Sequence, residues 1–315
     1  MAFVAMDLGG TKIYTVLCQE NGELLAEWRE ETLAREGPDK VLQQIKKSVN
    51  QVLHQGHLEL HQVRKMGICM AGYFDFNEKV LVYSPNIPGW NQVPLEELLS
   101  NEFGLSVMAE NDANAAAFGE VCEGSAKGMT EALYVTVSTG IGAGWVCRGK
   151  IYRGSQGFAG EMGHMKVRLE GELCGCGGKG CLETEASGTA IARKARQAIE
   201  SGQFIKGIGS AEALTTEDVF EAVQTGDKVA QTILREAIQY LGMGLANAVN
   251  LLNPQIIVVG GGVVKAGKAL LEPLEKEIRK NAVPALAKDL VLKKAALGSA
   301  SGVKGMIHLL RQGER

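Results

Sequence analysis

Four side chains that could bind a metal ion lie close together in the sequence. His164 is followed by Cys174, Cys176 and Cys181 in a stretch rich in glycine. Three thiolates and one imidazole are a typical tetrahedral zinc set, and four protein ligands leave no open position for a reactant. The spacing therefore predicts a structural zinc ion. Holding one nitrogen of His164 would aim the other at a ligand. A disulfide between two of these cysteines is the alternative, although it fits a reducing compartment poorly.

Two acidic side chains near this cluster, and one amide side chain elsewhere in the sequence, could hydrogen-bond to a sugar. Glu161 precedes His164 by three positions, and Glu183 follows Cys181 by two. Carboxylates accept hydrogen bonds from hydroxyl groups, so both are candidate sugar ligands. Each could instead be a solvated surface charge. Asn86 lies in a segment that its prolines and glycine mark as a loop, and it is a further candidate.

A second group of polar residues lies at an expected corner between a strand and a helix. Asn111 and Asp112 follow an apolar run and precede a helix of small residues, so their side chains can point into a cleft. One alternative is that either residue only caps the helix. In a kinase, Asp112 would accept the proton of a sugar hydroxyl and Asn111 would hold the ring. Backbone amides and Mg²⁺ would then stabilise the transferring phosphoryl group.

Glycine-rich loops follow apolar runs at three places, beginning at Asp7, Ser138 and Gly260. Without side chains, their amides can approach a polyphosphate closely, although tight hairpins use glycine for conformational reasons alone. Neither a Walker loop nor a spaced dinucleotide fingerprint is present in the sequence. Three such loops in one chain favour a nucleotide site of another kind.

The elements that would position these residues alternate between strands and helices, which indicates an α/β protein. Short apolar runs joined by tight turns predict strands, and apolar residues at helical spacing predict helices. We expect strands at 3–6, 13–18, 24–28, 66–70, 132–137 and 255–259, a glycine turn at 140–144 with a strand from 145, and helices at 38–54, 182–201 and 228–252.

Composition limits the classes of protein that fit. A length of 315 residues suggests two domains. The formal net charge of −3 provides no positive field for nucleic acid or for an anionic membrane. Apolar runs stay far below the roughly 20 residues of a membrane helix, and the N-terminus lacks the apolar run of a signal peptide. Seven cysteines, three of them clustered, indicate a reducing compartment with one metal site, so we expect a cytoplasmic protein.

Taken together, the motifs resemble the ROK family of sugar kinases and repressors, and they occur in the family's order along almost the whole chain. DLGGTK at Asp7 to Lys12 is similar to the family's phosphate loop. ENDANAAAFGE, which begins at Glu110, is similar to the family's catalytic segment. TGIGAG, which begins at Thr139, and GEMGH, which begins at Gly160, are similar to the family signature. CGCGGKGCLE, which begins at Cys174, is similar to the family's zinc loop.

The resemblance implies a two-domain actin-like ATPase (ribonuclease H-like) fold of the sugar kinase type, with sugar and ATP in the cleft between domains. The expected domains are 1–118, with the helix at about 300–315 packing back on it, and 119–299, which carries the zinc loop. Family members are commonly dimeric or tetrameric, so a homodimer or homotetramer is expected.

The resemblance also assigns roles to individual residues. Asp112 becomes the general base toward the sugar 6-hydroxyl, and Asp7 would lie near Mg²⁺. Sugar contacts fall to Asn86, Asn111, Asp112, Glu161, His164 and Glu183. The nucleotide would be lined by Gly9, Gly10, Thr11, Lys12, Thr139, Gly140, Gly261 and Gly262. Zinc falls to His164, Cys174, Cys176 and Cys181.

The implied reaction is ATP-dependent phosphorylation of glucose to glucose 6-phosphate. N-acetylmannosamine, N-acetylglucosamine, fructose and allose remain alternative sugars, because shared hydroxyl-binding residues do not reveal which epimer the pocket admits. A sugar-binding repressor is the alternative from another class. Repressors of the family carry a DNA-binding domain ahead of the sugar domain, and here Asp7 is already the seventh residue, so the sequence favours a kinase.

Overall fold

The structure is a computed structural model that describes residues 1–209, 211–212 and 214–313. Two compact units can be distinguished, and each gathers separate parts of the chain. The first contains Met1–Thr130, Gly144–Gly160 and the chain from Ala296 onward, and the second contains Glu131–Ala143 and Glu161–Ala295. The domain boundary expected between residues 118 and 119 stays a prediction, because these units are defined by packing alone.

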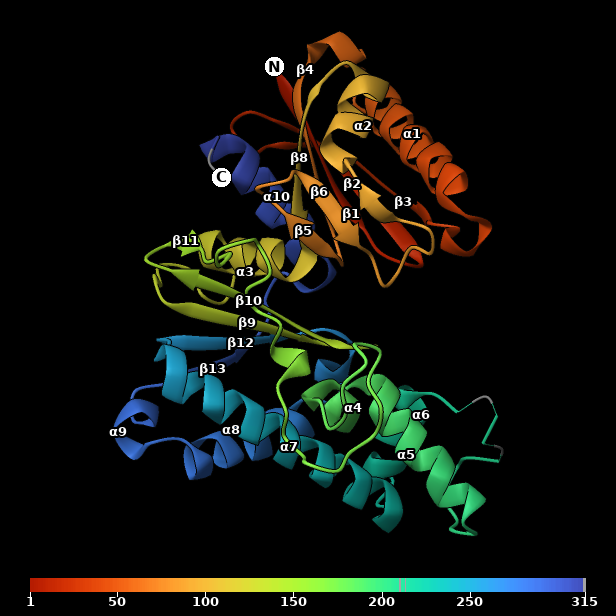
Figure 1. The fold of residues 1–315 in the computed structure, drawn as a ribbon, viewed down its shortest axis with the longest axis vertical. Coiled ribbons are helices and arrows are strands. Elements are labelled where there is room, and N and C mark those ends of the chain that lie inside the picture. Colours follow the sequence, from red (N-terminus) through yellow and green to blue (C-terminus); the bar gives the residue numbers. More distant parts are fainter. Residues whose placement is uncertain (210, 213, 314–315) are drawn as a thin grey trace. The chain divides into compact units, whose positions relative to one another are not determined.

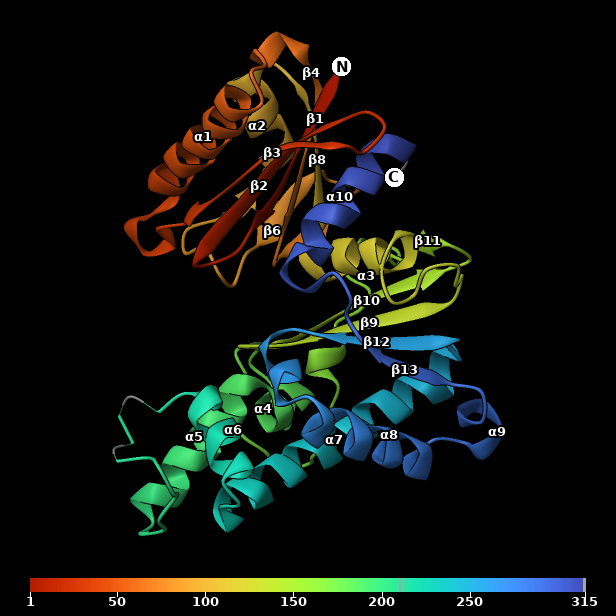
Figure 2. The same ribbon diagram turned by 180° about the vertical axis from the view of Figure 1, so that it is seen from behind.

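The first unit is built on a sheet with strand order β3-β2-β1-β4-β8. β1 pairs antiparallel with β2 and parallel with β4, which in turn pairs parallel with β8. Helix α1 lies on one face of this sheet and α10 on the other (Figures 1 and 2). The elements are β1 (Ala2–Leu8), β2 (Lys12–Gln19), β3 (Leu24–Glu31), α1 (Pro38–Gln55), β4 (Val63–Met70), α2 (Leu95–Phe103), β8 (Ser106–Asn111), α3 (Asp112–Cys122) and α10 (Ser301–Gln312).

The sheet follows from the sequence pattern. β1, and β4 from Met66 onward, are almost continuous apolar runs, as expected for strands covered on both faces. Met6 and Ile68 on these strands and Ile45 on α1 are completely buried. A small antiparallel sheet of β5 (Tyr73–Asp75), β6 (Val80–Tyr83) and β7 (Asn91–Val93) adjoins this core through Phe74 and Leu81.

The second unit contains a run of parallel strands, β9-β12-β13, within the sheet order β11-β10-β9-β12-β13. The long helix α7 packs against α8 beside this sheet (Figure 1). The strands of the second unit are β9 (Ala132–Val137), β12 (Ile256–Gly260) and β13 (Val291–Lys294). β10 (Ile141–Cys147) begins in the second unit, but its part from Gly144 onward belongs to the first unit, as does β11 (Lys150–Ile151). The helices are α4 (Leu182–Ala186), α5 (Gly188–Glu200), α6 (Thr216–Gln224), α7 (Lys228–Leu252), α8 (Lys268–Asn281) and α9 (Pro284–Ala287).

Most expected elements are confirmed, and two expectations are wrong. The glycine turn expected at 140–144 ends at Gly140, because Ile141 to Gly144 already belong to β10. The single helix expected at 182–201 is two helices, because Ser187 is extended and its hydroxyl accepts a hydrogen bond from the Ala190 amide (3.1 Å), which starts α5. In the described part of the chain, no helix combines the length and the apolar character needed to cross a membrane.

One buried carboxylate ties the end of the chain to the first unit. Glu120 on α3 is fully buried. Its oxygens accept hydrogen bonds from the amides of Ala296 (3.1 Å) and Leu297 (2.9 Å) and from the Ser301 hydroxyl (3.0 Å). The Ser125 amide donates a further bond of 2.7 Å. Glu120 therefore fixes the start of α10 against α3.

We expect Glu120→Ala to lower the free energy of unfolding by about 3 kcal/mol, because buried amide donors would lose their acceptor. Urea denaturation measures this change. Glu123→Ala, directly after the same helix, is the control, since its carboxylate pairs with Lys304 (3.2 Å) while remaining one-third exposed. The control should lose less than about 1 kcal/mol. Equal losses in both variants would contradict the role assigned to Glu120.

Candidate active site and metal centre

The corner between β8 and α3 carries the candidate catalytic residues. Asn111 ends β8, and its side-chain oxygen accepts hydrogen bonds from the amides of Ala113 (2.9 Å) and Asn114 (3.1 Å). The capping role considered for Asn111 is thus real. Its Nδ2 donates to the carbonyl of Gly72 (3.3 Å), which leaves the second Nδ2 hydrogen for a ligand. Asp112 opens the helix, and its Oδ1 accepts a bond from the Ala113 amide (2.9 Å).

Asp112 lies close to a second carboxylate, Asp7. The strand registers align Asp7 of β1 with Cys69 of β4 and with Glu110 of β8, directly before the corner. Burial, and after it the charge of Asp112, raises the pKa of Asp7 to about 7 against the opposing effect of Arg29. Burial also raises the pKa of Asp112, against the effect of its bond from the Ala113 amide. Both groups therefore hold protons more tightly than ordinary carboxyls do.

The first glycine loop lies at the same end of the sheet. The Gly9 amide donates to the carbonyl of Lys12 (2.9 Å), which closes a tight turn. Thr32 fixes the turn, because its hydroxyl donates to the Gly9 carbonyl (2.6 Å) and its amide to that of Thr11 (3.0 Å). A Cβ at Gly10 would lie 3.0 Å from the Cβ of Asn86. The first unit thus brings the phosphate-loop candidates next to the exposed candidate Asn86.

The four candidate metal ligands come together in the second unit. The ligand atoms of His164, Cys174, Cys176 and Cys181 all lie within 4.8 Å of one another. The Sγ atoms of Cys176 and Cys181 are 3.6 Å apart, and Sγ of Cys174 lies 3.5 Å from Nδ1 of His164. All seven cysteines of the chain are described, and none forms a disulfide. The cluster predicted from the sequence is confirmed as an arrangement of side chains, and the disulfide alternative is wrong.

The acidic residues beside this cluster differ in their surroundings. Oε2 of Glu183 accepts a hydrogen bond from the Ile141 amide (2.8 Å), and its Oε1 lies 3.9 Å from Sγ of Cys174. Glu183 is therefore a fixed group and not a freely solvated charge. Oε2 of the more exposed Glu161 lies 3.7 Å from Nε2 of His164, the nitrogen that points away from the cysteines. Both carboxylates thus lie beside the metal-ligand cluster.

The two remaining glycine loops lie side by side within the second unit. The Ser138 amide donates to the Gly140 carbonyl (2.9 Å), which forms a tight turn around Thr139. Gly261 has φ +85°, and any Cβ there would collide with the backbone of Val137. This close approach requires glycine. Gly262 lies close to the Ser138 hydroxyl, so the backbones of the two loops are neighbours.

Comparisons with known proteins agree with this arrangement. Residues 3–313 match the ROK family. A glucokinase of Halalkalibacterium halodurans is 35% identical over 99% of this chain and 96% of its own length. The chain belongs to the ROK family. A ROK glucokinase of Streptomyces griseus, solved in complex with glucose and AMPPNP, superimposes with a TM-score of 0.84 at 34% identity, covering 99% of this chain and 100% of that one. A xylose repressor of Caldicellulosiruptor bescii is 27% identical over 98% of this chain and 78% of its own length.

Membership of the ROK family confirms the fold implied by the motifs. Like its structural neighbours among ROK sugar kinases, the chain has the two-domain actin-like ATPase fold. Sequence reasoning nevertheless missed two side chains at the catalytic corner, Glu110 and Arg153, which form a buried ion pair. Glu110 stands inside the catalytic motif, but Arg153 lies 43 positions away, and only the fold brings the two together.

In this ROK protein, the buried Asp7 makes folding stability depend on pH. The folded state keeps the proton of Asp7 up to about pH 7, whereas the unfolded chain releases it near pH 4. Folding therefore binds a proton between these values, and the free energy of unfolding falls as the pH rises through them. Asp7→Asn removes this term, so we expect the variant to gain stability relative to wild type as the pH rises.

Thermal unfolding at pH 5 and pH 8, without nucleotide or magnesium, measures this effect. The melting temperature of Asp7→Asn minus that of the wild type should be larger at pH 8. Asp39→Asn, which changes an exposed carboxylate in the first turn of α1, is the control and should shift equally at both values. A pH-independent difference for Asp7→Asn would contradict the raised pKa.

Proposed function

We propose that this protein phosphorylates the 6-hydroxyl of a hexose, glucose first among them, with ATP as donor, giving glucose 6-phosphate and ADP. The observation that carries the proposal is the part-buried carboxylate of Asp112, which lies at the start of a helix directly after Asn111 and accepts a hydrogen bond from the Ala113 amide. Support comes from the glucokinase relatives and from the neighbour bound to glucose and AMPPNP.

Asp112 acts as the general base in this reaction. The 6-hydroxyl oxygen attacks the γ-phosphorus, its proton passes to the carboxylate, and the bond to the ADP oxygen breaks. The raised pKa of Asp112 suits this role, because a base works best when its pKa approaches the operating pH. Mg²⁺, which Asp7 would hold, supplies charge compensation for the phosphates.

Six side chains contact the sugar in the proposed reaction. They are Asn86, Asn111, Asp112, Glu161, His164 and Glu183. The nucleotide phosphates meet backbone amides of the glycine loops, a mode that needs no charged side chain. The proposed nucleotide contacts are Gly9, Gly10, Thr11, Lys12, Thr139, Gly140, Gly261 and Gly262.

We propose zinc as the ion held by the cysteine cluster. Zinc with bonds to sulfur of about 2.3 Å in tetrahedral geometry separates its ligands by roughly 3.8 Å. The observed separations of 3.5 and 3.6 Å agree with this size. Nζ of Lys166 lies 2.9 Å from Sγ of Cys181, and its positive charge balances thiolates. Bound through Nδ1, His164 would present Nε2 to the sugar.

A sugar-sensing regulator is the second candidate, favoured by the xylose repressor among the relatives. Both candidates need the sugar site, but only the kinase needs a base that acts on the bound hydroxyl. Cytoplasmic location, homodimer or homotetramer formation and the lack of nucleic-acid binding stay predictions.

Release of ADP, measured with Mg-ATP and a panel of sugars, tests the proposed function. We expect turnover with glucose to exceed that with mannose, fructose, allose, N-acetylglucosamine and N-acetylmannosamine. Asp112→Asn should lower kcat by a factor on the order of 10² to 10⁴ while glucose still binds, because the base acts chiefly in the transition state. Faster turnover with another sugar would change the assigned substrate and leave the proposed kinase activity standing. Glucose binding without turnover would favour the regulator.

Elemental analysis should find one zinc ion per chain. Cys176→Ser should lower the zinc content and the melting temperature together, because metal binding contributes to the stability of the folded loop. Cys122→Ser, a part-buried cysteine outside the cluster, is the control and should keep its zinc. A wild-type protein purified without zinc would refute this assignment.

A further inference from the structure

A buried ion pair lies directly before the candidate catalytic residues. Nε and Nη2 of Arg153 both donate to Oε2 of Glu110, at 2.9 and 2.7 Å. The side chain of Glu110 is 2% exposed and that of Arg153 is 18% exposed. Charge-assisted bonds of this kind are short and directional. The pair therefore fixes the position of the Glu110 carboxylate closely.

The other oxygen of Glu110 holds the catalytic corner itself. Oε1 accepts hydrogen bonds from the Asn111 amide (3.0 Å) and from Nδ2 of Asn114 (3.1 Å). Asn111 precedes Asp112, and Asn114 lies in the first turn of the same helix. A shift of the Glu110 carboxylate would thus move the backbone on which Asp112 is carried.

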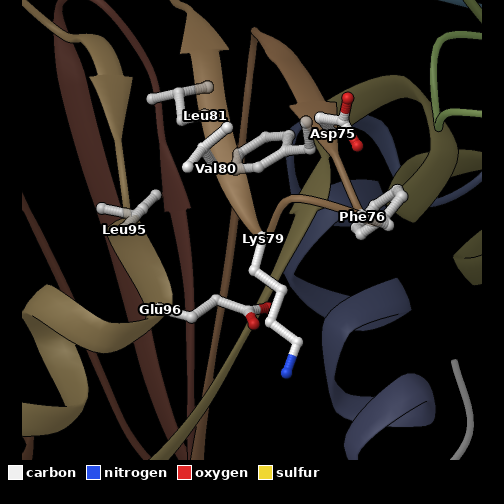
Figure 3. Close-up of a pocket in the computed structure, with 8 residues that line it drawn as sticks. Asp75, Phe76, Lys79, Val80, Leu81, Leu95 and Glu96 are labelled. Carbon is white, nitrogen blue, oxygen red and sulfur yellow. The ribbon is translucent and has the colours of Figure 1, made fainter.

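Arg153 is in turn fixed by the hairpin between β5 and β6. Its guanidinium lies 5.4 Å from the centre of the Phe76 ring. Figure 3 shows Phe76 on the side of the hairpin away from Leu81 and Leu95. The Phe76 amide donates to the Gln156 carbonyl (3.2 Å), which attaches the segment after Arg153 to the same hairpin.

A second carboxylate supports the same strand two residues earlier. Oε1 of Glu96, at the start of α2, accepts a hydrogen bond from the Ala109 amide (2.7 Å), two residues before Asn111. Figure 3 places Glu96 below the hairpin together with Lys79. The end of β8 is therefore held at two of its amides, and the pair of Glu110 and Arg153 is the support closer to Asp112.

We propose that Arg153 and Glu110 are positioning residues that hold Asp112 in line with the reacting hydroxyl. This proposal rests on the proposed function. In this proposal neither residue contacts the substrate, and both act through the Asn111 amide and the first turn of α3. Removing Arg153 would leave a buried negative charge without its partner, a condition that proteins relieve by local rearrangement. A displacement of about 1 Å can lower a rate by about a hundredfold.

Steady-state kinetics of Arg153→Met and Arg153→Lys test the proposal. We expect kcat to fall by about ten- to a hundredfold in Arg153→Met, with KM for ATP within about twofold of wild type. Arg153→Lys should lose less, because it keeps the charge but not the bidentate geometry. Adding Glu110→Gln to Arg153→Met should recover part of kcat, because it removes the unpartnered charge while keeping an acceptor for the Asn111 amide.

Lys194→Met is the control, since Lys194 pairs with the buried Glu185 at 3.1 Å and matches the ion pair of Arg153 in exposure. Its melting temperature should fall as far as that of Arg153→Met, while kcat stays near wild type. All assays run well below the melting temperatures.

Three outcomes would count against these proposals in different ways. An Arg153→Met enzyme with unchanged kcat would overturn the positioning role alone. Equal losses of kcat in Arg153→Met and Lys194→Met would reduce it to general stability and also overturn it. A folded wild-type protein without kinase activity would overturn the proposed function and this proposal with it.

Discussion

Parallel pairing of β1, β4 and β8 is the constraint on which the candidate active site depends. Parallel strands end at the same edge of a sheet, and here the register aligns Asp7, Cys69 and Glu110 in one row. The next residues along these strands begin the loops and the helix that carry the site. The same arrangement recurs in the second unit, where β9 and β12 run parallel and lead into the turns at Ser138 and Gly261. Each unit therefore offers its functional loops at the carboxyl ends of parallel strands.

Carboxylates clustered at this edge of the sheet are costly to ionise, and two of them, Asp7 and Asp112, have raised pKa values. Asp7 keeps a pKa of about 7 because burial and the charge of Asp112 outweigh the effect of Arg29. The carboxylate of Glu110 accepts two hydrogen bonds from Arg153, which gives it a structural role. The pKa values of Asp7 and Asp112 are raised. Raised values are common where a group must exchange protons or bind a cation.

The sequence was sufficient for features that local pattern determines. Apolar runs located β1, β4, β9 and β12, and the cysteine spacing found the metal-ligand cluster. Features set by distant contacts were out of reach. Gly144 was assigned to a turn, but it lies in β10, where glycine is required because a Cβ would collide with the carbonyl of Ala113. The roles of Glu120 and Arg153 depend on partners far away in the chain, and a single sequence carries no signal for such pairings.

Glu183 shows why the metal-ligand cluster and the glycine hairpin act as one structure. One oxygen of Glu183 accepts a hydrogen bond from the Ile141 amide, directly after the turn at Thr139, and the other oxygen lies beside Cys174. A side chain at Gly140 would collide with this carboxylate, so the turn and the acid can approach only because glycine stands there. The metal-ligand candidate Cys174 thus lies next to the carboxylate that accepts the first amide of β10. A structural metal can in this way order a ligand site to which it contributes no open coordination position.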